Sequence, residues 1–142
     1  WLGATSLCCE KVKKAIVIGA TSGIGKEVAK LLAQNGYLVG ITGRRTQLLE
    51  ELRTTNPNQF ITQTFDCVTA NNAEELDHLA KQLGGLDLLF LSSGVGHLNR
   101  ALDYQLEDET NQLNVNAFTQ IMVWAYNYFY SQGSGHLAVI TS

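Results

Sequence analysis

The sequence predicts an α/β fold in which a doubly wound parallel sheet carries helices on both faces. Three observations lead to this prediction. Short apolar runs alternate with longer segments of helical period along the chain, as in repeated strand–helix–strand units. The apolar runs are nearly continuous, which is typical of strands buried on both sides. A glycine-rich segment, Gly19–Gly25, joins the first strand to the first helix, and we call it the glycine turn.

The N-terminal half of the chain predicts three strands and two helices. Ala15–Gly19 is rich in β-branched residues and ends in glycine, which indicates a buried strand. From Ile24 to Leu32 apolar residues recur at helical spacing, and Gly36 ends that helix. The other elements expected here are a strand over 38–42, a helix over 46–53 that Asn56-Pro57 ends, and a strand over 60–65.

The C-terminal half continues the alternation. Asn72, with Glu75 three residues later, predicts a capped helix start, and Gly84-Gly85 predicts the end of that helix. A strand over 86–91, a long helix from about 106 to 130 and a fifth strand over 136–141 follow. Because crossovers between parallel strands are right-handed, we expect the first strand at the centre of the sheet, with the chain reversing direction after the third.

Length and charge exclude several classes of function. The chain has 142 residues, enough for one domain. Its net charge of −3 provides no basic excess for a nucleic-acid partner. Its apolar runs are far shorter than the ~20 residues of a membrane-spanning helix, so no membrane partner is expected. The three cysteines lack CxxC spacing, which predicts a reducing, cytoplasmic setting and no metal site.

The two ends of the chain add an expectation about domain bounds. We expect residues 1–13 to be an N-terminal extension and residues 14–142 to form the domain. The only methionine is Met122, and the chain stops at Ser142 directly after an apolar run. The sequence therefore predicts an α/β domain that is truncated after its fifth strand.

The glycine turn is the clearest candidate binding site. Its Gly-x-x-x-Gly-x-Gly spacing allows a tight turn and close approach of the backbone to a pyrophosphate. The helix N-terminus that follows supplies free N–H groups and the positive end of the helix dipole. The plainer interpretation is a tight strand-to-helix turn without a ligand. The candidate cofactor-binding residues are Gly19, Thr21, Ser22, Gly23, Ile24 and Gly25.

A nucleoside-triphosphate loop is a second interpretation of the same segment. Residues 20–26 nearly match it, with Gly25-Lys26 in the required place. The next residue should be a serine or threonine that ligates Mg²⁺, but it is Glu27, whose carboxylate would face phosphate oxygens. The first glycine of that motif is also replaced, by Ala20. We therefore set this interpretation aside.

The glycine turn and the segments after it resemble the short-chain dehydrogenase/reductase family, from about Lys14 to Ser142. The family motif Thr-Gly-x-x-x-Gly-x-Gly reads Ile18–Gly25 here, with isoleucine in place of threonine. The resemblance implies a Rossmann fold and hydride transfer between a nicotinamide cofactor and a carbonyl or alcohol substrate. It also implies a homodimer or homotetramer formed through the helix around Asn114 to Tyr130. In that helix the aromatic residues Trp124, Tyr126, Tyr128 and Phe129 predict a second buried surface.

The end of the second strand predicts which cofactor binds. An acidic residue there would accept a hydrogen bond from the ribose 2′-hydroxyl and favour NAD. This sequence instead has Gly43 followed by Arg44 and Arg45. A guanidinium can hold the 2′-phosphate of NADP through two parallel hydrogen bonds, so we expect NADP (NADPH). The plainer alternative is a solvated pair of arginines.

The resemblance assigns further cofactor contacts. Asp66 matches the family aspartate that accepts from the adenine amino group, with Cys67 beside it. The family's Asn-Asn-Ala-Gly after the fourth strand reads 91–94 as Leu-Ser-Ser-Gly here, so only the glycine is retained. Ser93 and Gly94 are the residues expected against the cofactor ribose.

The resemblance also assigns two catalytic positions. Asn114 matches the asparagine that holds a water in the proton relay, with Asn116 as runner-up, and Ser142 matches the serine that positions the substrate oxygen. The family's Tyr-x-x-x-Lys acid/base should follow, but no tyrosine in this chain has lysine four residues later. We therefore expect the printed chain alone to be inactive. The alternative function is a non-catalytic NADP-binding module that senses redox state.

Overall fold

The structure is a computed structural model that describes residues 12–21, 23–66, 71–92 and 104–140. For residues 104–115 the description covers the helical backbone alone. The predicted N-terminal extension therefore lies almost wholly outside the described residues, and its separation from the domain stays a prediction.

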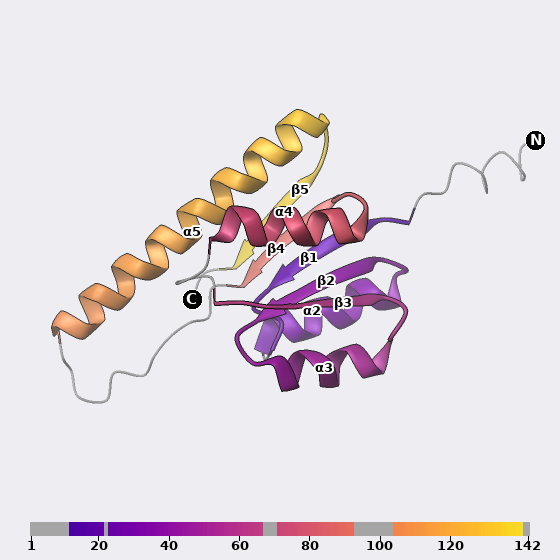
Figure 1. Cartoon of the computed structure of the whole chain (residues 1–142), viewed down its shortest axis with the longest axis horizontal. Helices are drawn as coiled ribbons and strands as arrows, with labels where there is room; N and C mark the ends of the chain where they lie inside the picture. Colours follow the sequence, from indigo (N-terminus) through magenta and orange to yellow (C-terminus); the bar gives the residue numbers. More distant parts are fainter. Residues whose placement is uncertain (1–11, 22, 67–70, 93–103, 141–142) are drawn as a thin grey trace, which may run out of the picture.

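Five parallel strands form one sheet in the order β3-β2-β1-β4-β5 (Figure 1). The first strand is central, because Ile18 pairs with Thr42 of β2 on one side and with Leu91 of β4 on the other. This order confirms the doubly wound topology predicted above, including the reversal after the third strand. The strands are β1 (Lys14–Ile18), β2 (Leu38–Gly43), β3 (Phe60–Thr64), β4 (Leu88–Ser92) and β5 (His136–Ile140).

Helices cover the two faces of the sheet in pairs. Helices α2 (Gly23–Gln34) and α3 (Thr46–Thr55) lie on one face, and α4 (Asn72–Leu83) and α5 (Tyr104–Gln132) lie on the other (Figure 1). The central strand supplies both cores by alternation, since Val17 packs with α2 and α3 whereas Ile16 and Ile18 pack with α4 and α5. This burial on both sides explains why the strands read as continuous apolar runs.

The start of α4 differs from the prediction by one residue. Asn71, not Asn72, is the N-cap, and its Oδ1 accepts from the backbone N–H of Glu74 at 3.4 Å. Asn72 is the first helical residue and only 1% exposed, and its Nδ2 donates to Oε1 of Gln120 in α5 at 2.9 Å. Both asparagines suit a cap, so the prediction that Asn72 fills it was wrong because the contact with α5 decides between them.

Helix α5 has a core-facing side and an exposed side. Trp124 is buried in the core cluster, and Tyr128 and Phe129 are half-buried against it, so the burial of Trp124 is explained within the domain. The exposed side carries Val123, Tyr126 and Tyr130, which are 53%, 65% and 76% exposed. Their spacing of three and four residues places them on one stripe of the helix. Of the helices in the described part of the chain, none is long and apolar enough to cross a membrane.

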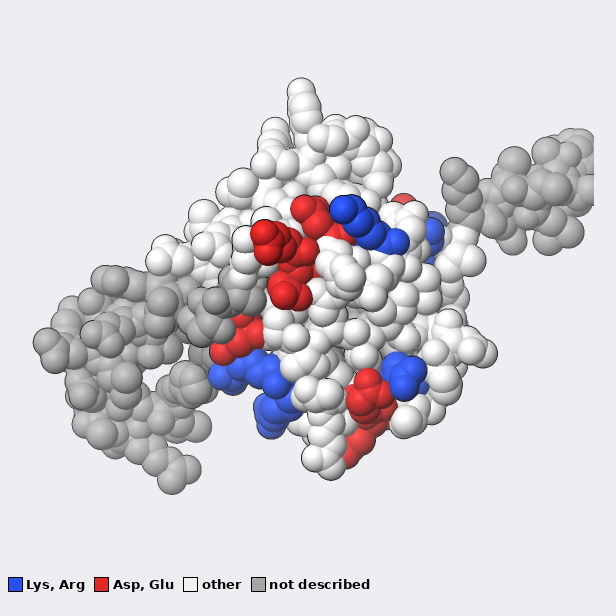
Figure 2. Space-filling view, viewed as in Figure 1, with Lys and Arg blue, Asp and Glu red and all other residues white. Residues whose placement is uncertain are grey.

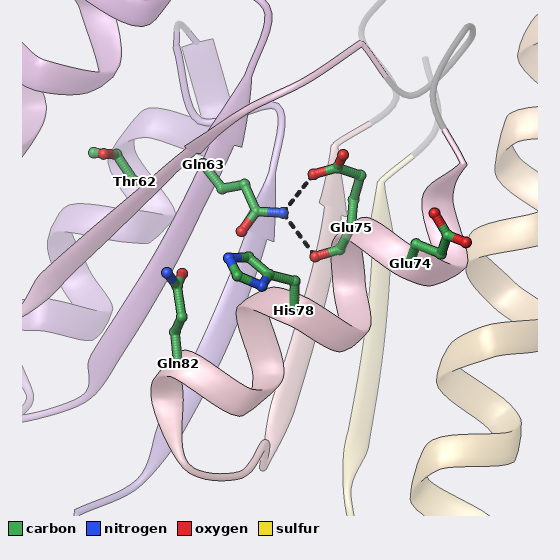
Figure 3. A pocket seen from close by; sticks show the side chains of 6 residues that line it. All are labelled: Thr62, Gln63, Glu74, Glu75, His78 and Gln82. Atoms are coloured by element: carbon green, nitrogen blue, oxygen red, sulfur yellow. Dashed lines mark hydrogen bonds between the residues drawn. The ribbon is translucent and has the colours of Figure 1, made fainter.

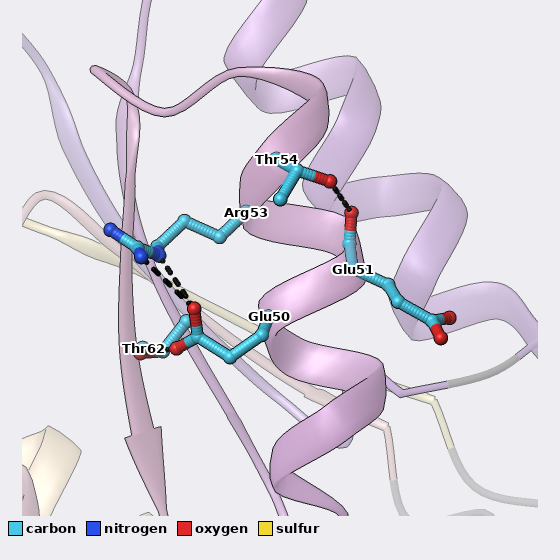
Figure 4. A network of polar contacts seen from close by, with 5 residues as sticks. All are labelled: Glu50, Glu51, Arg53, Thr54 and Thr62. Atoms are coloured by element: carbon cyan, nitrogen blue, oxygen red, sulfur yellow. Dashed lines mark hydrogen bonds and ion pairs between the residues drawn. The ribbon is translucent and has the colours of Figure 1, made fainter.

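A polar network holds α3 against the edge strand β3 (Figure 4). Glu50 Oε2 accepts from Nε of Arg53 at 3.0 Å and pairs with Nη2 of the same guanidinium at 3.0 Å. The other carboxylate oxygen of Glu50 accepts from Oγ1 of Thr62 in β3 at 3.1 Å. Helix α3 follows β2 after a connection of only two residues, Arg44 and Arg45.

Candidate functional site

The described sheet has its topological switch point at the carboxyl ends of β1 and β4. From β1 the chain proceeds outward to β2 and β3, and it then returns to the other side of β1 to form β4 and β5. Because the strands are all parallel, their carboxyl ends meet at one edge of the sheet (Figure 1). Ligands of open α/β sheets bind in the crevice at such a point. The glycine turn starts there, directly after Ile18.

The glycines of this turn are required by backbone conformation and by close packing. Gly19 and Gly23 have φ of 84° and 63°, in the left-handed region that favours glycine. A Cβ on Gly19 would lie 2.7 Å from the carbonyl oxygen of Ser92 at the end of β4, and a Cβ on Gly25 would collide with the carbonyl oxygen of Gly19. Beside Gly23, in contrast, no described atom lies within 4 Å of the place a side chain would take. Among the described residues, the turn is therefore tightly packed at Gly19 and Gly25 but not at Gly23.

Backbone hydrogen bonds hold the glycine turn against β2. The carbonyl oxygen of Thr42 accepts from the N–H of Gly19 at 3.1 Å and from that of Ala20 at 3.0 Å. The first turn of α2 contains no acidic residue, and the next residue, Glu27, is exposed and pairs with Lys30 at 3.8 Å. The N–H groups and the positive end of the helix dipole at this terminus therefore face no carboxylate from the first turn. Ile24 is exposed at this end of the helix. The arrangement suits an anion such as a pyrophosphate.

The segment after β2 supplies positive charge at the same edge of the sheet. Arg44 and Arg45 are exposed, and neither forms an ion pair within the described part of the chain. Arg45 is the N-cap residue of α3 but makes no capping hydrogen bond through its side chain. Figure 2 shows basic side chains gathered beside the start of α3, with acidic side chains directly next to them, over α3 itself and over α4. The arginine pair is therefore available to an anionic group at the end of β2.

The structure describes only some of the candidate residues that follow β3. Asp66 is half-buried just after β3, where the N–H of Phe65 donates to the carbonyl oxygen of Gly43 at 3.1 Å and keeps the two strand ends together. Asn114 lies within α5, and its side chain is outside the description. The expected roles of the remaining candidates stay predictions, because these residues lie outside the described part: Ser22, Cys67, Ser93, Gly94 and Ser142.

Two residues at this edge were missed as site-forming by sequence reasoning. Thr42 is a buried polar residue in an otherwise apolar strand, and its carbonyl oxygen fixes the glycine turn. Ser92 closes β4, and its Cβ lies 3.4 Å from the Cβ that a residue other than glycine would have at position 25. The polar residue at the end of each apolar run is the signal that identifies both.

An open hollow of about 500 Å³ lies elsewhere, between β3 and α4 (Figure 3). Gln63 Nε2 donates there to the carbonyl oxygen of Glu75 at 2.8 Å and to Oε2 of the same residue at 2.6 Å. The hollow is separated from β1 and the glycine turn by β2, so it is not part of the candidate site. Within the described residues no group of three or more metal-ligating side chains occurs, here or at the turn. The hollow is lined by Thr62, Gln63, Glu74, Glu75, His78 and Gln82.

Comparison with known proteins gives one consistent result. The sequence profile of the family described as short chain dehydrogenase matches residues 13–142. An uncharacterized oxidoreductase of Staphylococcus aureus is 33% identical over 138 residues, covering 92% of this chain and 58% of that protein. One from Staphylococcus epidermidis is 29% identical over 135 residues, covering 93% of this chain and 59% of the relative. The chain thus spans less than two thirds of the length of these relatives.

Solved structures match over the same portion. A hydroxysteroid dehydrogenase from Escherichia coli superposes with a TM-score of 0.79 at 25% identity, covering 92% of this chain and 55% of that one. An acetoin dehydrogenase from Enterobacter cloacae also gives 0.79, at 27% identity, covering 93% and 57%. The five-strand sheet described above therefore corresponds to about half of each of these structures.

Proposed function

Since the chain belongs to the short-chain dehydrogenase family, we propose that it forms the NADP-binding part of an oxidoreductase acting on small carbonyl or alcohol substrates. When bound, the nicotinamide donates or accepts the hydride. The residues of this chain bind and orient the dinucleotide. Its three cysteines without CxxC spacing support the expectation of a cytoplasmic setting.

The observation that carries the proposal is the glycine turn at the switch point. It is fixed from one side by the Thr42 carbonyl oxygen and packed from the other on Ser92. Its backbone N–H groups and the start of α2 offer hydrogen bonds to an anion, and the first turn of α2 carries no carboxylate. A pyrophosphate is the group of a dinucleotide that needs such a cradle.

The preference for NADP over NAD rests on the end of β2. Position 43 is a glycine, so the sequence provides no carboxylate there to accept from a ribose 2′-hydroxyl. Arg44 and Arg45 follow, exposed and without an ion-pair partner in the described residues. A guanidinium in this place holds a 2′-phosphate through charge-assisted hydrogen bonds. Asp66, at the end of the neighbouring strand, is proposed to accept from the adenine amino group.

The catalytic roles follow the family pattern. We assign Asn114 to hold a relay water and Ser142 to position the substrate oxygen, beside a cofactor that Ser93 and Gly94 would contact. The general acid/base of the family, Tyr-x-x-x-Lys, does not occur in the printed chain. The chain by itself is therefore expected to bind cofactor but to reduce carbonyl compounds at a rate near background, since a positioned acid contributes ~10²–10⁴-fold.

The exposed stripe of α5 supports self-association. Val123, Tyr126 and Tyr130 present apolar and aromatic surface on one face, and the two tyrosine rings stack with centroids 5.9 Å apart. Aromatic residues that leave water together are typical anchors of protein interfaces. We propose that this stripe pairs with its copy in a homodimer or homotetramer.

A non-catalytic NADP-binding redox sensor is the second candidate. The coding sequence downstream of Ser142 separates the two. A continuation with that motif should restore carbonyl reduction when it is expressed with the chain, and Ser142→Ala should then lower turnover sharply. A continuation without the motif would favour the sensor.

Calorimetric titration of the chain with NADPH and with NADH tests the proposed cofactor. We expect NADPH to bind at least about tenfold more tightly, the effect of a single charge-assisted contact. Equal or tighter binding of NADH would overturn the choice of NADP. Binding of neither would overturn the cofactor-binding function itself.

A further inference from the structure

The backbone conformation at position 43 does not require a glycine, but the packing around it does. Gly43 is not among the glycines with positive φ, so an L-residue fits its backbone conformation. The obstacle is a neighbour, because a Cβ at this position would lie 2.5 Å from Cγ2 of Thr21 in the glycine turn. Real Cβ atoms do not approach other carbon atoms so closely. The methyl group of Thr21 therefore occupies the space that any side chain at position 43 would need.

The backbone at this contact is tied on both sides. The strand end cannot move away from the turn freely, since the carbonyl oxygen of Thr42 accepts from two N–H groups of that turn. On its other side, the carbonyl oxygen of Gly43 accepts from the N–H of Phe65 at 3.1 Å. The side chain of Leu49 in α3 also reaches within 3.7 Å of the same Cβ position. Relief of the clash would thus have to come from the Thr21 side chain.

We propose that Thr21 is a specificity-determining residue, whose methyl group keeps position 43 free of any side chain and so excludes the carboxylate that would favour NAD. This inference rests on the proposed NADP binding and extends it to a residue outside the arginine pair. A carboxylate at position 43 would accept from a ribose 2′-hydroxyl and would repel a 2′-phosphate beside Arg44. Thr21 acts by occupying space, and its hydroxyl is not needed for this role.

A thermal double-mutant cycle tests the steric part without any cofactor. In the wild-type background, Gly43→Ala should lower the unfolding midpoint by roughly 3–10 °C, the shift expected for overpacking by one methyl group. In a Thr21→Ser background, which removes only the Thr21 methyl, the same substitution should lower the midpoint much less or raise it slightly. Thr21→Val, which keeps a methyl group and removes the hydroxyl, is the matched control and should leave Gly43→Ala destabilising.

Cofactor titration of the corresponding aspartate variants tests the specificity part. Gly43→Asp should weaken NADPH binding at least about tenfold and lower the unfolding midpoint. Thr21→Ser combined with Gly43→Asp should recover the midpoint and bind NADH at least about tenfold more tightly than Gly43→Asp alone, while NADPH binding stays weak. Recovery of the unfolding midpoint together with tighter NADH binding supports the proposal.

Two results would overturn it. If Gly43→Ala is equally tolerated with threonine and with serine at position 21, the Thr21 side chain rotates away and does not control position 43. If the midpoint recovers but NADH binding does not, Thr21 is a packing residue without a role in cofactor choice. Failure of the wild-type chain to bind either dinucleotide would instead remove the proposed function, and the cofactor role of Thr21 with it, whereas the thermal cycle would still decide the contact.

Discussion

Trp124 of α5 donates its indole N–H to the carboxylate of Asp77 in α4, with 2.8 Å between Nε1 and Oδ1. The indole is buried and stacks on the ring of Tyr128, at a centroid distance of 5.1 Å. Five residues before Asp77, the contact between Asn72 and Gln120 joins the same two helices. These side chains hold α5, the helix that also carries Asn114, in one position against α4.

Removal of the Asp77 carboxylate should therefore destabilise the fold. Asp77→Ala leaves the buried indole N–H without its acceptor, and the expected loss is about 1–3 kcal/mol in the free energy of unfolding. Asp77→Asn keeps an oxygen acceptor and should lose less. Urea unfolding followed by tryptophan fluorescence measures both. Equal stability of the alanine variant and the wild type would show that the hydrogen bond contributes nothing.

Tyr128 predicts a loss of stability at alkaline pH. Burial raises the pKa of its hydroxyl above 10.0, and the nearby carboxylates of Asp77 and Asp87 raise it further. Below pH 10 the hydroxyl is protonated in both the folded and the unfolded chain, so the stability of the fold is not reduced by its ionisation. Above pH 10 the tyrosine of the unfolded chain loses its proton before that of the folded chain does. The free energy of unfolding therefore falls as the pH rises from about 10 through the pKa of the folded state.

The variant Tyr128→Phe keeps the ring but has no proton to lose. Its urea midpoint should fall less steeply than that of the wild type as the pH rises above about 10. Tyr126→Phe, which removes an exposed hydroxyl from the same helix, is the matched control. Identical pH profiles for wild type and Tyr128→Phe would contradict the prediction.

Arg44 should contribute to NADPH binding and little to NADH binding. Arg44→Ala removes the guanidinium proposed to hold the 2′-phosphate, and we expect NADPH affinity to fall by about 1–3 kcal/mol, or roughly 5–150-fold. Arg44→Lys keeps the positive charge but not the planar guanidinium, so its NADPH affinity should lie between those of the wild type and Arg44→Ala. Arg53→Ala makes the same change of charge at the other end of α3, where Arg53 pairs with Glu50, and serves as the control. Equal losses for NADPH and NADH would place Arg44 outside the phosphate site.

The exposed stripe of α5 should govern self-association. Replacing Tyr126 and Tyr130 together by serine removes two stacked exposed rings and should shift an oligomer toward monomer in sedimentation velocity. Because both side chains are exposed, the stability of the monomer should change by less than about 0.5 kcal/mol for each. Leu31→Ser, which changes an exposed apolar residue on the opposite face of the sheet, is the control. A wild-type chain that stays monomeric at high concentration would contradict the proposed interface.

Local sequence patterns were enough to predict the order of strands and helices and the place of the glycine turn. These features depend on local patterns: apolar runs, helical spacing, and glycines at the strand ends. Right-handed crossovers then leave few topologies, so even the central position of β1 was predictable, and the observed element bounds lie within two residues of the predicted ones. The pattern of Gly43, Arg44 and Arg45 was likewise visible without a structure.

Which of several equivalent residues takes each role depends instead on tertiary contacts. Asn71 and Asn72 both suit a helix cap, and the contact of Asn72 with Gln120, 48 positions away, leaves the cap to Asn71. The sequence pattern alone allows every aromatic residue of α5 to form an interface, but packing against α4 and the sheet removes Trp124 from that set. From the sequence, Gly43 shows only that no acidic residue stands at this position. The structure shows that the methyl group of Thr21 lies where a side chain at position 43 would be. Each of these outcomes depends on contacts between residues far apart in the chain, which local patterns do not encode.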